Sequence, residues 1–171
     1  DQAFAVSSDD LAKAISRVGS SAVDAGVSMD QLLAITTAVQ QRTARGGAVI
    51  GNAFKTIFTR LGRVDVQKKL AAIGVATRDM QGAMLPATKV LEDLADKFKD
   101  LSQVQQNSIA ESVAGVFQVN ILRATLGDLS TKYGVYNRAL KESASATNEA
   151  YQKNEQLNET LDALVNKSLA N

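Results

Sequence analysis

Apolar residues in the first sixty positions recur every three or four residues, which is the spacing of one face of an α-helix. The pattern predicts three helices, within residues 8–25, 28–45 and 48–61. Ser28 and Gln31 have the spacing of a capping box, in which each side chain satisfies a free backbone N–H of the first turn. The apolar positions of these helices include Leu11, Ile15, Val18, Ala22, Leu32, Ile35, Val39, Ile50, Phe54, Ile57 and Leu61.

Glycines divide this region. Glycine readily takes the left-handed conformation that follows the last turn of many helices. The pair Gly46–Gly47 is therefore predicted to end the second helix, and Gly62 the third. A short fourth helix is predicted over 64–73, with Gly74 after it.

The segment from Val75 to Pro86 has a different pattern. Residues 75–77 and 83–85 can each be extended, and Asp79 and Gly82 suit the first and last positions of a type I turn. The sequence predicts a small two-stranded hairpin here. A hairpin of this size must pack on the helices, because it is only marginally stable alone.

Helical spacing resumes after Pro86, a residue suited to a helix start. Ser102 and Gln105 form a second capping box, and Gly115 is placed to allow a close helix crossing. The hydrophobic anchors predicted for the compact part are Leu33, Phe54, Phe58, Leu91 and Phe117.

From about Ser130 the chain lacks proline, and its last glycine is Gly134. A heptad seam runs through Tyr136, Leu140, Ser143, Thr147, Ala150, Asn154, Leu157, Leu161, Leu164 and Ser168. The seam is apolar at both ends and polar in its middle, which is typical of a weak coiled coil whose partner matters. Leu157, Leu161 and Leu164 are candidate partner contacts.

These patterns predict a mostly all-α fold. A compact multi-helix module would span residues 1–129, with the hairpin near 75–86, and a long helix would span 130–171 as a possible coiled-coil start. The 171 residues are 45% hydrophobic but only 5% aromatic. Side chains as small as Ala and Val favour closely spaced helices.

Composition excludes several kinds of chemistry. The chain has no cysteine and no histidine, which removes thiol nucleophiles, the commonest metal ligands and the usual general base. No apolar run approaches the ~20 residues needed to cross a bilayer. The start at Asp1 has no basic region of a signal peptide and suggests a cut within a longer protein. No enzyme activity, metal or cofactor is expected.

Two motifs could indicate either a functional site or an ordinary structural role. Gly46, Gly47 and Gly51 approximate a phosphate loop, but Asn52 and Ala53 stand where Lys and Ser or Thr are required, so a helix–helix turn is favoured. Acidic pairs lie beside lysines, which is typical of solvated helix faces.

The stretch from Arg42 to Lys69 is basic. Its seven cations and one acid, Asp65, give a local charge of +6, although the whole chain carries only +1. A solvated face, a protein interface and a DNA contact all remain open. Without interleaved aromatic residues, only weak and salt-sensitive DNA binding is expected, or none. Its cations are Arg42, Arg45, Lys55, Arg60, Arg63, Lys68 and Lys69.

The order of these elements resembles the core region of phage tail tape measure proteins. The resemblance covers roughly residues 8–130 and rests on several short segments. They are Leu11-Ala-Lys-Ala-Ile-Ser-Arg-Val-Gly19, Ala25-Gly-Val-Ser-Met-Asp-Gln-Leu-Leu33, the Arg45-Gly-Gly turn leading into Asn52-Ala-Phe-Lys-Thr-Ile-Phe-Thr-Arg-Leu61, Lys69-Leu-Ala-Ala-Ile-Gly-Val75, Leu85-Pro86, Val90-Leu-Glu-Asp-Leu94 and Ala110-Glu-Ser-Val-Ala-Gly-Val-Phe-Gln-Val-Asn-Ile-Leu122.

The resemblance implies a structural protein of the virion, made in the bacterial cytoplasm. Such a protein sets the length of the tail tube during assembly and leaves the tube at infection to assist DNA delivery. Implied partners are tail tube proteins, tail tip proteins, assembly chaperones and further copies of the same chain. The competing classes are a secreted or host-side helical effector that binds a protein or a membrane, and, less favoured, a lytic hydrolase.

Overall fold

The structure is a computed structural model that describes residues 7–170, apart from the side chains of 144–154 and 168–170. The sequence-based expectation for Asp1 lies outside the described residues. The described helices are α1 (Ser8–Val18), α2 (Ser21–Asp24), α3 (Met29–Thr43), α4 (Gly47–Leu61), α5 (Val64–Ala72), α6 (Ala87–Phe98), α7 (Gln103–Ala114), the 3₁₀ turn η1 (Val116–Gln118), α8 (Val119–Leu129) and α9 (Val135–Ala170). The prediction of a mostly helical fold is confirmed.

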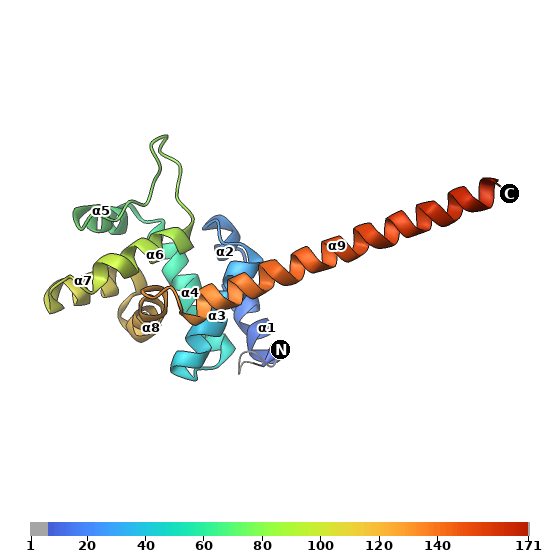
Figure 1. Ribbon diagram of the computed structural model, residues 1–171. Coiled ribbons are helices and arrows are strands. Elements are labelled where there is room, and N and C mark those ends of the chain that lie inside the picture. The colour runs from blue at the N-terminus through green and yellow to red at the C-terminus, as the bar shows by residue number, and fades with distance from the viewer. Residues whose placement is uncertain (1–6, 171) are drawn as a thin grey trace.

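Helix α4 organises the compact part, called the head below (α1 to α8 and their connections). It contacts α1, α2, α3, α5, α7 and α8. Its apolar face is fully enclosed, and the rings of Phe54 and Phe58 stack with centroids 5.6 Å apart. Figure 1 shows the other helices gathered around it and α9 leaving the head as a single straight helix.

Most predicted helix starts are confirmed. The Ser7 side chain caps α1, and both capping boxes form with the predicted partners, Ser28 with Gln31 and Ser102 with Gln105. These caps depend only on residues three positions apart, so the sequence alone determines them.

The glycine pair at 46–47 acts differently from its prediction. Helix α3 ends three residues earlier, and Ala44 takes the left-handed conformation there, with φ 54°. Gly46 instead precedes α4 in an extended conformation, and Gly47 is the first residue of α4. The pair therefore begins a helix and does not end one.

The predicted hairpin at 75–86 is wrong. The described residues contain no strand or sheet, only an isolated antiparallel bridge between Arg78 and Met84. The turn does form, because the N–H of Gly82 donates to the carbonyl of Asp79 at 3.0 Å. The two arms pair over too few residues to make strands, and Figure 1 shows the segment as a loop extending beyond the helices.

The predicted core anchors are correct in three of five cases. Phe54, Phe58 and Leu91 are buried, and Leu33 is half-buried. Phe117 is wrong, because its side chain is 95% exposed. Gly115, with φ 76°, ends α7 and turns the chain, so the helical spacing that predicted burial stops two residues before Phe117.

Candidate functional site

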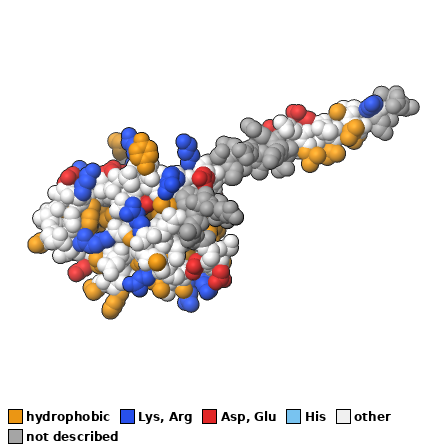
Figure 2. Space-filling model, turned by 60° about the horizontal axis from the view of Figure 1, so that its bottom comes forward, with side chains coloured by type: hydrophobic (Ala, Val, Ile, Leu, Met, Phe, Trp, Pro, Cys, Tyr) orange, Lys and Arg blue, Asp and Glu red, His pale blue; other side chains and the backbone are white. Residues whose placement is uncertain are grey.

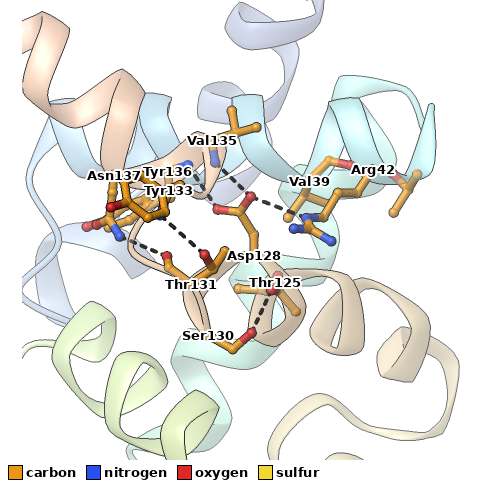
Figure 3. A network of polar contacts seen from close by, with 12 residues as sticks. Val39, Arg42, Thr125, Asp128, Ser130, Thr131, Tyr133, Val135, Tyr136 and Asn137 are labelled. Atoms are coloured by element: carbon orange, nitrogen blue, oxygen red, sulfur yellow. Dashed lines mark hydrogen bonds and ion pairs between the residues drawn. The ribbon is translucent and has the colours of Figure 1, made fainter.

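The base of α9 is a buried polar junction between three helices (Figure 3). Asp128, at the end of α8, has a side chain that is 1% exposed. Its Oδ1 accepts from the N–H of Val135 at 2.9 Å and from Arg42 Nε at 3.2 Å, and its Oδ2 accepts from the N–H of Tyr136 at 2.9 Å. One carboxylate thus caps the first turn of α9 and pairs with a cation from the end of α3.

This junction is closely packed. A Cβ on Gly134 would clash with the backbone oxygen of Asp128, so only glycine fits at position 134. Two residues later, Tyr136 is 1% exposed and belongs to the core. Burial, followed by the negative charge of Glu92, raises the pKa of Tyr136 to about 12.

The head covers only the beginning of the predicted heptad seam. Tyr136 is buried, and Ala139 and Leu140 pack partly against the core. The middle seam positions Thr147, Ala150 and Asn154, together with Ser168, have side chains outside the described set. The first seam positions are therefore engaged within the chain and are not available to a partner.

The distal part of α9 carries an uncovered apolar stripe. Leu157, Leu161, Leu164 and Val165 are each at least half exposed. In the heptad register, the acidic residues of this segment (Glu155, Glu159 and Asp162) fall on the outer face, away from the seam. Figure 2 shows hydrophobic side chains along one edge of the distal helix and acidic ones on the opposite edge.

The cations of the basic stretch have different partners. Arg42 is held at the α9 junction, whereas Arg60 and Lys69 meet at Ser112 of α7. Arg60 Nε donates to the Ser112 carbonyl at 2.9 Å, and Lys69 Nζ lies 2.9 Å from its hydroxyl.

The remaining cations of this stretch are surface residues. Arg63 pairs with Asp65 at 3.3 Å. Arg45, Lys55 and Lys68 are exposed. Figure 2 shows blue side chains dispersed over the visible face of the head. Weak or absent DNA binding stays a prediction.

The glycines that approximate a phosphate loop serve helix packing. Gly47 and Gly51 lie one turn apart on α4 and face α1. A Cβ on Gly51 would lie 2.5 Å from the carbonyl oxygen of Ala14, and one on Gly47 would clash with the backbone of Asp10. The backbones of α1 and α4 approach too closely for any side chain at these positions.

Asp10 joins the same two helices. Its Oδ1 accepts from the N–H of Gly47 at 2.9 Å, which caps α4 from α1. That hydrogen bond, followed by the one from Ser7, holds the pKa of Asp10 below its ordinary value of 3.8. The cap is therefore charged at neutral pH and complements the positive end of the α4 dipole.

The described residues lack the features of two other kinds of site. They contain no group of three or more acidic, histidine or cysteine side chains that could hold a metal ion. None of the described helices is long and apolar enough to span a bilayer.

A family model described as phage-related minor tail protein matches residues 1–115 of the chain. The chain belongs to this family. No solved structure matches it. Membership of this family makes the chain a structural component of the virion tail, with other tail proteins as its partners. The match ends at Gly115, so α8, the Asp128 junction and the leucine stripe of this minor tail protein lie beyond the matched segment.

The leucine spacing of this minor tail protein is visible in its sequence, whereas the Asp128 junction is not. Asp128 and Arg42 are 86 residues apart, and neither stands in a motif. The available signal was local: an aspartate followed within seven residues by Gly134 and a long uninterrupted helix.

Proposed function

We propose that the chain is part of a tail tape measure protein, which sets the length of the tail tube during assembly and is released at infection to assist DNA delivery. The observation that carries the proposal is α9, a helix of 36 residues that extends from the head as a single helix. A helix gives length in fixed proportion to residue number, which is the property a molecular ruler needs. The role is structural and requires no catalytic group.

The rise of ~1.5 Å per residue makes the length of α9 about 54 Å. The family match supports a place in the tail, and the resemblance of residues 8–130 to tape measure core regions supports the more specific role. Tail tube proteins, tail tip proteins and assembly chaperones are the partners proposed on this basis.

The ruler role predicts that tail length follows helix length. Repeats of residues 141–168 can be inserted in the phage gene, in heptad register, after the codon for residue 168 of this chain. Each copy should lengthen the tail by about 42 Å, at ~1.5 Å per residue. Tail lengths are measured by electron microscopy of purified particles. Inserts of equal residue number rich in Gly and Ser serve as controls and should not lengthen tails in that proportion. Tails of unchanged length with helical inserts would contradict the role.

The partner proposed for the leucine stripe is a further copy of the chain, aligned in parallel. Leu157, Leu161 and Leu164 recur at four and three residues, which is the spacing of a coiled-coil seam. Because Glu155, Glu159 and Asp162 point outward in this register, identical helices can meet without opposing carboxylates. The stripe is short, so the association is weak on its own.

Sedimentation equilibrium of the whole chain tests this partner. The unmodified parent chain should form a weak, concentration-dependent oligomer. The triple variant L157S/L161S/L164S should be monomeric, because the seam loses its apolar burial. The matched control E155Q/E159Q/D162N changes the other face of the same turns and should still associate. Equal association of the parent and the serine variant would assign the interface to another surface.

A further inference from the structure

We propose that Asp128 makes the base of α9 a rigid joint, which fixes the direction of the helix relative to the head. Releasing the carboxylate should loosen that direction while leaving the head folded. The inference is independent of the tape measure role, because it concerns only how two parts of this chain are joined.

The first support is the set of donors around Asp128. Val135 N–H and Tyr136 N–H are successive backbone groups of the first turn of α9, and the two carboxylate oxygens divide them. Two bonds to one helix end restrict rotation as well as position. Arg42 adds a third bond from α3, so the same side chain links α3, α8 and α9.

The second support is burial. The Asp128 side chain is 1% exposed, whereas that of Arg42 is 42% exposed. A buried carboxylate is stable only when all its partners are in place, since loss of one leaves a desolvated charge poorly compensated. The arrangement therefore tolerates little displacement of α9.

The third support is steric and does not depend on charge. Gly134 lies against Asp128 so closely that a Cβ would meet its backbone oxygen. Tyr136, 1% exposed, fills the core directly after it. Together they hold the connection between α8 and α9 at the start of the capped turn.

Asp128→Asn isolates the joint. An Asn side chain keeps the shape but has one acceptor oxygen and one NH₂ donor. Because backbone donors face both oxygens of Asp128, the NH₂ group must oppose an N–H in either orientation. The cap is lost in part while no cavity is created.

The chain has no cysteine, so it suits site-directed spin labelling. Labels at N52C on α4 and E155C on α9 report the direction of the helix, because both positions are exposed and neither residue contributes a hydrogen bond to the joint. Labelled chain is diluted in excess unlabelled chain to remove distances between copies. Pulsed dipolar spectroscopy should give one narrow distance peak for the parent and for the control D100N, which changes an exposed aspartate.

Asp128→Asn should lose the narrow peak while thermal unfolding of the head stays cooperative. Gly134→Ala should shift or broaden the distance peak, because the added Cβ would clash with the backbone oxygen of Asp128. If Asp128→Asn fails to fold, Arg42→Gln removes only the outer donor, and it should broaden the peak in a folded protein. A peak as narrow as the parent's in the folded variants would overturn the proposal.

Discussion

Phe54→Ala should destabilise the head by about 3–5 kcal/mol, the usual cost of removing a fully buried ring and leaving a cavity. Phe54 is 0% exposed at the centre of α4 and stacks on Phe58, so the surrounding helices cannot close the space without moving α4. Urea denaturation followed by circular dichroism measures the change.

Phe117→Ala is the matched control, because it removes the same ring from a side chain that is 95% exposed. It should change the free energy of unfolding by no more than about 0.5 kcal/mol. A large loss at Phe117, or a loss below about 1 kcal/mol at Phe54, would contradict the assignment of these two rings.

Gly51→Ala should destabilise the protein by about 1–3 kcal/mol, even though alanine is the better helix former. The new Cβ would lie 2.5 Å from the Ala14 carbonyl oxygen and 2.7 Å from the Arg17 Cβ. Most of this crowding involves backbone, so α1 must move away from α4. The same denaturation measurement applies.

The control for this substitution is Gly127→Ala in α8. Gly127 is also a helical glycine, but its added Cβ would lie 3.5 Å from the nearest atom, the flexible end of Arg42. Alanine should therefore be neutral or stabilise the protein by about 0.5–1 kcal/mol. Equal destabilisation at both positions would mean that helix approach is not the cause.

The features predicted correctly from sequence are those controlled by near neighbours. Ser28 with Gln31 and Ser102 with Gln105 act within one turn, so their spacing is sufficient. The apolar spacing around Phe54 likewise identifies the buried side of α4, since it follows the period of a single helix.

One error and one omission have a physical origin in contacts between distant segments. Gly47 is needed because α1 approaches α4, and that approach cannot be read from the glycine pair alone. The Asp128 junction combines residues from α3, α8 and α9. The Phe117 error is local, because Gly115 was predicted to allow a close helix crossing, whereas it ends α7.

The burial of Tyr136 also has a consequence for the order of synthesis. The core of the head includes Tyr136 and, at its edge, Leu140, both from the first turns of α9. Translation delivers these residues after all the helices they pack against, and domains form as units while the chain emerges. The part of the core that Tyr136 fills therefore stays unoccupied until α9 has begun to leave the ribosome. During that interval the nascent chain exposes apolar surface that the folded protein buries.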